Sequence, residues 1–205
     1  MPRITLKPRK QPLQDRSQQT VTTILEAASR ILEREGLAGF TTNAVAGRAG
    51  VSIGSLYQYF PNKDSLVVAL IHVEQQALID ALGSKIAAIG DAPLEDGIEQ
   101  LIATALASHA RKPRMTAALD HEETRLPIGP ILTFYRQQLD QVVAEFLRMH
   151  LRDCSDDEIM TAARSTRIIA QCVIDDYAIG RPADFGLARS EATKAVLGYL
   201  AKCAP

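Results

Sequence analysis

Two short, capped helical segments meet at Gly50, early in the 205-residue chain. Thr41 stands at the N-cap position of the first segment, and Gly50 ends it, because glycine accepts the left-handed backbone that a helix stop requires. Ser52 stands at the N-cap position of the second segment, which Pro61 stops. Two short helices joined by a tight turn that contains glycine form a helix-turn-helix, and the spacing predicts this motif here.

Helical periodicity also governs the rest of the chain, with no strand-like alternation of any length. Apolar residues at three-and-four spacing predict a helix from about Ser17 to Gly36, ahead of the motif. After the motif we expect helices, separated by proline and glycine breaks, over about residues 63–89, 93–112, 114–124, 131–151, 155–179 and 188–202. Asn62 stands at the N-cap position of the first of these helices, and Ser155 and Glu158 form a capping box at the start of the fifth. The predicted fold class is therefore all-α with about nine helices, a three-helix N-terminal head and a larger helical body.

Charge divides unevenly along the chain, although the net charge is only −1. Residues 1–63 carry nine Lys/Arg and four Asp/Glu, whereas the remainder carries fourteen and twenty, so the N-terminal end suits a polyanion such as DNA. We predict a basic arm over residues 1–15, a helix-turn-helix domain over 16–76 and a body domain over 77–205. The arm either reaches DNA phosphates or a minor groove, or it contacts nothing.

Composition and motifs disfavour several classes of protein. With 46% hydrophobic residues, no apolar run long enough to cross a bilayer and no signal peptide, we expect a cytoplasmic protein without a membrane partner. Cys154, Cys172 and Cys203 lack the spacing of a zinc site and the even number of a disulfide framework. The adjacent His121 and Glu122 point to different sides of a helix, and no glycine-rich phosphate loop or nucleophile elbow occurs. We therefore expect no metal, no cofactor, no catalytic residue and no enzyme.

The second helix of the motif presents a small, polar face away from the core. If Leu56 points inward, Gly54 and Gln58 point outward at 100° per residue, with Ser55 and Tyr57 beside them. Glycine lets the backbone approach a groove closely, while hydroxyl and amide groups meet phosphates and base edges. This helix is therefore our candidate for reading DNA.

Residues 50–61 contain no Lys or Arg, so the bidentate arginine that reads guanine is absent from this helix. We expect specificity from hydrogen bonds of Gln58 and Ser55 to base edges, and from DNA shape. Apolar contact of Ile53 or Tyr57 with thymine methyls should add to it. Arg48 and Lys63 flank the helix and are placed to hold a base or a phosphate.

Many residues of the motif and its flanks fall in a recognisable order. They are Phe40-Thr41-Thr42, Val45-Ala46, Ala49-Gly50-Val51-Ser52, Gly54-Ser55-Leu56-Tyr57-Gln58-Tyr59-Phe60, Lys63 and Leu66. This run, with the helix before it, resembles the signature of the TetR family of bacterial regulators over about residues 17–70. Gly47 departs from the pattern, since a glycine inside a helix costs about 1 kcal/mol relative to alanine. The resemblance implies an all-helical homodimer with a DNA-binding head and a body that binds a small effector.

The resemblance also implies which residues contact DNA. In the family, the threonine that opens the first motif helix, hydroxyl and aromatic residues of the second, and the lysine that opens the next helix have this role. Together with the outward-facing and flanking residues, the predicted DNA-binding set is Thr41, Thr42, Arg48, Ser52, Ile53, Gly54, Ser55, Tyr57, Gln58, Tyr59 and Lys63. The expected partner is double-stranded operator DNA.

Small residues recur along the last two predicted helices and allow close helix packing. Two such helices from each of two chains would form a four-helix interface, which the resemblance implies; the alternative is packing within one chain. The predicted interface residues are Ala163, Ala170, Val173, Ala192, Val196, Tyr199 and Leu200. A two-fold dimer would place its two heads one DNA turn apart, roughly 34–36 Å.

The helices between the head and the expected dimer helices would enclose an effector pocket. The candidate polar residues are His72, His109, His121, Glu122, Tyr135, Arg136 and Asp176. Pockets of this kind are mostly apolar, so we expect an organic, hydrophobic effector. The function predicted from the sequence is a repressor released from a pseudo-palindromic operator by this effector. The alternative is a helix-turn-helix regulator without a small-molecule effector, controlled by a protein partner or acting as an activator.

Overall fold

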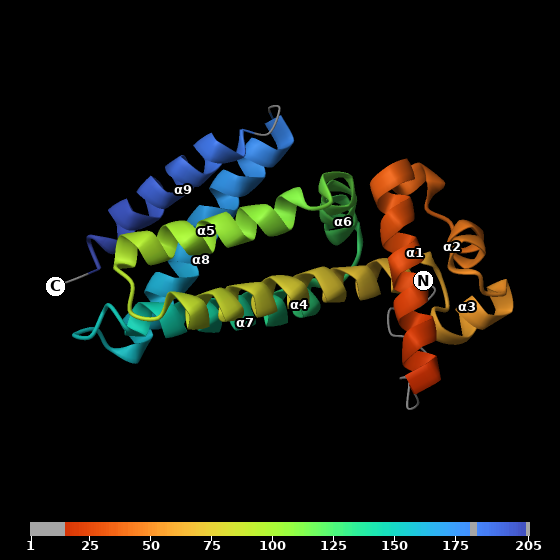
Figure 1. The fold of residues 1–205 in the computed structure, drawn as a ribbon, viewed down its shortest axis with the longest axis horizontal. Coiled ribbons are helices and arrows are strands. Elements are labelled where there is room, and N and C mark those ends of the chain that lie inside the picture. The colour runs from red at the N-terminus through yellow and green to blue at the C-terminus, as the bar shows by residue number, and fades with distance from the viewer. Residues whose placement is uncertain (1–14, 181–183, 204–205) are drawn as a thin grey trace. The chain divides into compact units, whose positions relative to one another are not determined.

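The computed structural model describes residues 15–180 and 184–203. Within these residues it contains nine helices and no strand, as the periodicity predicts (Figure 1). They are α1 (Asp15–Gly39), α2 (Thr42–Ala49), α3 (Ile53–Tyr59), α4 (Lys63–Ile89), α5 (Leu94–Ala110), α6 (Pro113–Arg125), α7 (Gly129–Arg148), α8 (Asp156–Gly180) and α9 (Phe185–Leu200). The predicted basic arm lies outside the described residues except for Asp15, which begins α1.

Gly36 interrupts α1 with the left-handed φ of 65° expected of a helix stop, and a further helical turn runs on to Gly39. Two other helix boundaries differ from the sequence prediction by three residues. α7 ends at Arg148 rather than at residue 151. α9 begins at Phe185 rather than at residue 188. Asp184 caps it, because its carboxylate accepts the backbone N–H of Leu187 at 3.0 Å.

The chain divides into two compact units. The head unit comprises Met1–Gln75 and Lys112–Ile128, and the body unit comprises Gln76–Arg111 and Gly129–Pro205. α4 contributes residues to both units, so the boundary expected between residues 76 and 77 falls inside this helix. α6 groups with the head unit, although it lies well beyond that boundary in the sequence.

The head unit has an apolar core drawn from α1, α2, α3 and the first half of α4. Ile24, Phe40, Leu56 and Phe60 each have at most 1% of their surface exposed. Helical spacing places Ile24 and Leu56 on the inner sides of α1 and α3, and the two phenylalanines directly follow these helices. α6 packs along α1 and buries Met115 in the same unit.

Helix α4 is the one described helix whose length and hydropathy match those of a membrane span. Core helices of soluble proteins share both properties, so a single such helix is weak evidence for a membrane. Leu66, Val67 and Leu70 in its first half are buried in the head unit, which accounts for part of its apolar character.

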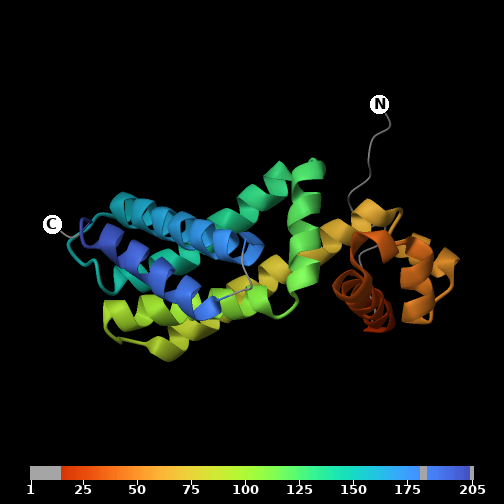
Figure 2. The same ribbon diagram turned by 90° about the horizontal axis from the view of Figure 1, so that it is seen from above.

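The body unit packs α8 against α7 and α9, with α5 lying along α9 (Figure 2). α5 approaches α7 closely at Gly97, where a Cβ would lie 2.1 Å from Cζ of the fully buried Phe146. Arg167 of α8 pairs with Asp140 of α7, and their side chains are only 12% and 8% exposed. The body unit is therefore fixed by contacts between residues far apart in the sequence.

Candidate nucleic-acid interface

Helix α3 turns one side to the core of the head unit and the other side outward. Leu56, and Phe60 just after the helix, are buried as the predicted geometry requires. Four exposed residues make up what we call the outward face of α3: Ile53, Gly54, Tyr57 and Gln58. Two of them are large and apolar, with 37% of Ile53 and 42% of Tyr57 exposed. The outward face therefore offers apolar contact, an amide, and a glycine at which a partner can approach the backbone.

Hydrogen bonds at the helix ends confirm the predicted caps. Thr41 Oγ1 accepts the backbone N–H of Ala44 at 3.1 Å at the start of α2, and Gly50 ends that helix with a φ of 68°. Ser52 Oγ accepts the N–H of Ser55 at 3.0 Å and lies 2.8 Å from the Ser55 hydroxyl. These local contacts set the direction in which α3 leaves the turn, and thereby which of its sides faces outward.

The two predicted DNA-contacting tyrosines have different surroundings. The hydroxyl of Tyr57 lies 3.2 Å from Thr42 Oγ1, so this exposed ring is tied to the start of α2. Tyr59 is partly buried, and its hydroxyl lies 3.0 Å from Ser17 Oγ of α1. Tyr57 is therefore part of the outward face, whereas Tyr59 chiefly joins α3 to α1. Arg48 is exposed in the last turn of α2.

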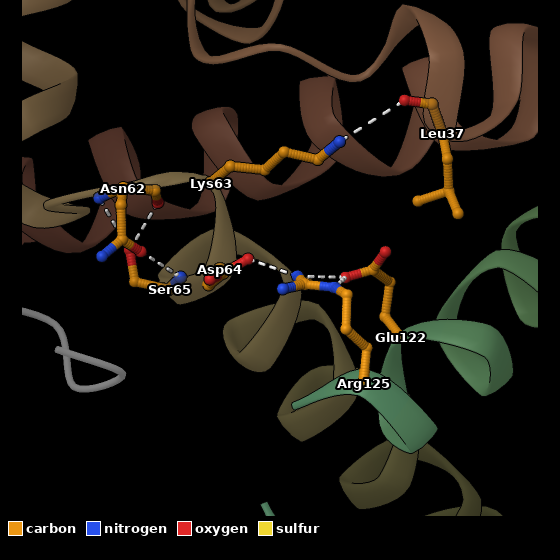
Figure 3. A network of polar contacts seen from close by, with 7 residues as sticks. All are labelled: Leu37, Asn62, Lys63, Asp64, Ser65, Glu122 and Arg125. Carbon is orange, nitrogen blue, oxygen red and sulfur yellow. Dashed lines mark hydrogen bonds and ion pairs between the residues drawn. The ribbon is translucent and has the colours of Figure 1, made fainter. Parts of the chain in front are cut away.

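An open hollow of about 360 Å³ lies beside Tyr57. Its lining residues come from the end of α1, from α3, from the starts of α2 and α4 and from the connections between these helices: Leu37, Ala38, Phe40, Thr41, Thr42, Tyr57, Pro61, Asn62 and Lys63. The Lys63 ammonium lies 5.4 Å from the centre of the Phe40 ring. It donates to the Leu37 carbonyl oxygen at 3.4 Å (Figure 3). A lysine, threonine hydroxyls and two helix N-termini together favour an anion such as a DNA phosphate.

The start of α4 is held by Asn62, as predicted. Its Oδ1 accepts the backbone N–H of Ser65 at 2.8 Å, and Ser65 Oγ donates to the Asn62 carbonyl oxygen at 2.7 Å. The sequence does not indicate that Asn62 also lines the hollow, because an N-cap pattern does not reveal which distant residues surround the capping side chain.

Asp64, the residue after Lys63, belongs to a network of ion pairs. Arg125, at the end of α6, lies between the carboxylates of Asp64 and Glu122 and pairs with both (Figure 3). Its hydrogen bonds, to Glu122 first and to Asp64 second, raise the pKa of the guanidinium above its ordinary value. This network ties α6 to the first turn of α4, the turn that carries Lys63.

The other end of α6 is bound to α1. The backbone N–H of Met115 donates to the Glu33 carboxylate at 2.9 Å, and a guanidinium nitrogen of Arg114 donates to the Arg34 carbonyl oxygen at 2.8 Å. Lys112, just before α6, lies 3.5 Å from the carboxylate of Glu74 in α4. α6 is thus attached to the head unit at both ends, through partners that sequence spacing alone could not identify.

The residues predicted to line an effector pocket are distributed over both units. In the head unit, Glu122 is buried in the ion pair with Arg125, His121 is exposed, and His72 is partly buried, which lowers the pKa of its imidazole. The structure therefore gives Glu122 a partner inside the head unit instead of leaving it free for a ligand.

In the body unit, Tyr135 is 7% exposed and burial raises the pKa of its phenol, while Arg136 and Asp176 are exposed. Asp175 faces inward instead of Asp176: burial raises the pKa of its carboxyl, and the nearby charge of His109 lowers it. His109 is partly buried in the last turn of α5.

Four of the predicted dimer residues are buried inside the single chain: Ala163, Ala192, Val196 and Leu200. Their small or branched side chains allow α8 and α9 to pack closely on the body core, which is the intrachain alternative considered for them. Ala170, Val173 and Tyr199 are partly buried. The exposed sides of these helices carry other residues, among them Ile168, Cys172, Ala195 and Gly198.

Comparison with known proteins matches both parts of the chain. A family model described as bacterial regulatory proteins, tetR family, matches residues 24–70, and one described as tetracyclin repressor-like, C-terminal domain, matches residues 93–200. The two models together cover more than half of the chain.

Individual proteins with similar sequences include a protein named as a transcriptional repressor and one named as a nucleoid occlusion factor. The HTH-type transcriptional repressor KstR of Mycolicibacterium smegmatis is 38% identical over 72 residues, 35% of each chain. The nucleoid occlusion factor SlmA of a Marinomonas species is 28% identical over 131 residues, 60% of this chain and 66% of the relative. The chain thus spans somewhat less than two thirds of the length of SlmA relatives, 59% for the Haemophilus influenzae protein. A TetR-family regulator from Streptomyces coelicolor has the same fold, with a TM-score of 0.72, 20% identity, and coverage of 90% of this chain and 97% of that one.

Proposed function

Because the chain belongs to the TetR family of bacterial regulatory proteins, we propose that it is a cytoplasmic repressor that a small hydrophobic effector releases from a pseudo-palindromic operator. Its role as a DNA-binding transcriptional regulator follows from the family. The proposal adds the sign of regulation, the effector, the dimer and the residues that carry each role.

The outward face of α3 is the observation that carries the DNA-reading role. Ile53 and Tyr57 are exposed one helical turn apart on a helix that buries Leu56 on its inner side. Exposed apolar groups of this size favour a contact surface, and Gln58 beside them supplies the donor and acceptor that pair with adenine. The hollow around Lys63 supplies the neighbouring phosphate contact.

Dimerisation is proposed through the exposed sides of α8 and α9. Ile168 is 45% exposed on α8, and Ala195 and Gly198 are exposed on α9. A large apolar residue together with small ones permits close packing of a second copy on these helices. The predicted residues buried inside the chain then support the interface from behind.

The effector is proposed to act through α4 and α6. α4 has residues in both units, and α6 is fixed to the head unit at both ends, so a movement of either helix changes the setting of Lys63 and α3. A coupling free energy of about 1–3 kcal/mol is typical of such systems and changes affinity about 5- to 150-fold.

The test begins with selection of duplexes from a random pool by the purified full chain. We expect a consensus with two half-sites whose centres lie about one helical turn apart. A titration of that duplex against a library of hydrophobic metabolites should then yield a compound that lowers operator affinity at least several-fold. A selection without any consensus would contradict the DNA-reading role, whereas a consensus without any effector would contradict only the switch.

The SlmA relatives favour a second candidate, since their name describes nucleoid occlusion and not transcription. In this case the chain would bind DNA without a small-molecule effector, and a protein partner would control its activity. Chromosomal mapping of bound sites separates the two: a few sites at promoters support the repressor, whereas many dispersed sites support the second candidate.

A further inference from the structure

Two cysteines that are 49 residues apart in the sequence meet at one end of the body unit. Cys154 lies in the turn between α7 and α8, and Cys203 lies in the final turn after α9. The Cys154 Sγ is 3.5 Å from the carbonyl oxygen of Cys203. The sequence alone does not indicate this pair, because the spacing of the three cysteines matches no known framework.

The surroundings of the pair permit a bond between the sulfurs. Both cysteines are partly buried at the edge of the body core, and each has a free thiol. Contact between one thiol and the other residue's own backbone is compatible with the Cα separation that a disulfide spans, about 4.4–6.8 Å. The Cys203 Sγ also lies 3.6 Å from the Tyr199 carbonyl oxygen, which keeps it on the inner side of the last turn.

We propose that Cys154 and Cys203 form a redox site, in which a thiol oxidant converts the two thiols into an intramolecular disulfide. The disulfide fastens the end of α9 to the turn before α8 and closes a loop that contains both of these helices. The site is separate from the DNA-reading residues and does not depend on the proposed function.

The two thiols have different roles in the oxidation. Burial raises the pKa of the Cys154 thiol, and the nearby Glu158 and Cys203 raise it further. Because the thiolate is the reactive form, a raised pKa slows the attack of Cys154 on an oxidant, so we assign the first step to Cys203. Cys154 then acts as the second thiol that completes the disulfide.

The atoms and electrons of the reaction balance when hydrogen peroxide is the oxidant. The Cys203 sulfur attacks a peroxide oxygen, the O–O bond breaks, and a sulfenic acid and one water form. The Cys154 sulfur attacks the sulfenic sulfur, the S–S bond forms, the S–O bond breaks, and a second water carries away the thiol proton. Two electrons pass from the sulfurs to hydrogen peroxide. A low-molecular-weight disulfide achieves the same oxidation by two exchange steps that release two thiols.

The third cysteine provides a control. Cys172 is a free cysteine that is exposed on α8. Trypsin separates the three cysteines into peptides 153–164, 168–189 and 203–205, so the pairing can be read directly by mass spectrometry.

The experiment treats the reduced full chain with hydrogen peroxide in one arm and with oxidised glutathione in the other, then alkylates and digests it. We expect peptide 153–164 joined to peptide 203–205, lighter by two hydrogen atoms and separated by dithiothreitol, with Cys172 unbonded to either. Cys172→Ser should keep this product, and Cys203→Ser should lose it. A product in one arm alone identifies the class of oxidant.

Several results would overturn the redox site. They are alkylation of both thiols in both arms, stable glutathione adducts at the two positions, or cross-links that all involve Cys172. The Tm is a second readout, because closing a loop of this length should raise it by about 5–10 °C. An unchanged Tm in a chain that carries the disulfide would contradict the fastening of α9.

Discussion

Arg167 in the body unit and Arg125 in the head unit both join two helices through carboxylates, but their surroundings differ. Arg167 is 12% exposed and its partner Asp140 is 8% exposed, whereas Arg125 is 44% exposed and pairs with Asp64, which is 21% exposed, and with the buried Glu122. The body unit depends on long-range contacts in its interior. The head unit keeps polar groups at its surface, where a partner can reach them. We therefore expect substitutions in the body to lower stability, and substitutions on the outward face of α3 to lower DNA affinity without lowering stability.

The largest expected effect is on the buried ion pair. Arg167→Leu leaves Asp140 without its partner in the core, so it should lower the free energy of unfolding by about 3–5 kcal/mol in a urea titration. The double variant Asp140→Leu/Arg167→Leu should recover much of this loss, because it removes both charges. Arg125→Leu is the matched head variant. It also leaves a buried carboxylate, Glu122, without its partner, but it should cost less because the Arg125 side chain is 44% exposed and Asp64 is partly exposed. Equal losses for Arg167→Leu and Arg125→Leu would remove the difference between the units.

The second expected effect separates two glycines. Gly97→Ala places a Cβ against the buried Phe146 ring and should lower the free energy of unfolding by about 1–3 kcal/mol. Gly47→Ala in α2 is the matched control, because nothing lies within 4 Å of its added Cβ. It should raise the free energy of unfolding by up to about 1 kcal/mol. Thermal melts of both variants check the signs, and a stabilised Gly97→Ala would contradict the close approach of α5 to α7.

The third expected effect is on recognition. Gln58→Ala removes the amide from the outward face of α3, so affinity for the selected operator should fall by about 1–2 kcal/mol, roughly 5- to 30-fold. Affinity for unrelated duplexes should not change, and neither should the Tm. Gln76→Ala, at an exposed site of α4 in the body unit, is the control for removal of a surface amide. An equal fall for selected and unrelated duplexes would show that Gln58 does not read bases.

The fourth expected effect is on phosphate binding. Lys63→Met keeps the approximate length of the side chain but removes its charge, so it should weaken binding of selected and unrelated duplexes alike, by about 1 kcal/mol. The slope of log affinity against log salt should fall by about 1 for each phosphate that the protein no longer neutralises. Lys85→Met, in the body half of α4, should leave that slope unchanged. A slope that does not respond to Lys63→Met would exclude the hollow as a phosphate site.

The smallest expected effect concerns acid stability of the body unit. The Ser155 hydroxyl and backbone N–H donate to the Glu158 carboxylate at 2.7 and 2.8 Å, and these bonds hold its pKa below the ordinary value of 4.5. The stabilisation is present above pH 4.5 and is lost as the pH falls through the lower pKa of the folded state. Melting curves from about pH 7 to about pH 3 should show a slightly smaller decline for Glu158→Gln than for the wild type. The exposed Glu145 serves as control through Glu145→Gln, and identical curves for all three proteins would contradict this role of the capping box.

The sequence predicted the head unit in more detail than the body unit, for a physical reason. Helix caps at Thr41, Ser52 and Asn62 act within three residues, so their spacing is visible in the chain, and the structure confirms each cap. The inward position of Leu56 follows equally from helical geometry.

Contacts between distant residues could not be predicted in this way. The attachment of α6 to the head unit depends on Glu33 and Asp64, which no local pattern connects to Met115 or Arg125. The same limit applies to the small residues of α8 and α9, such as Ala163, which lie in the chain's own core. Small residues indicate close helix packing, but they do not indicate which helix is the neighbour.

Competitive binding tests the outward face of α3 most directly. The full chain is titrated with its selected duplex and with a shuffled duplex of the same composition, at one moderate salt concentration, and the two Kd values are compared. We predict a ratio of about 10³ or more for the wild type, falling several-fold in Gln58→Ala, while Gln76→Ala keeps the wild-type ratio. Equal Kd values for the two duplexes with the wild-type protein would contradict the assignment of this face to DNA reading.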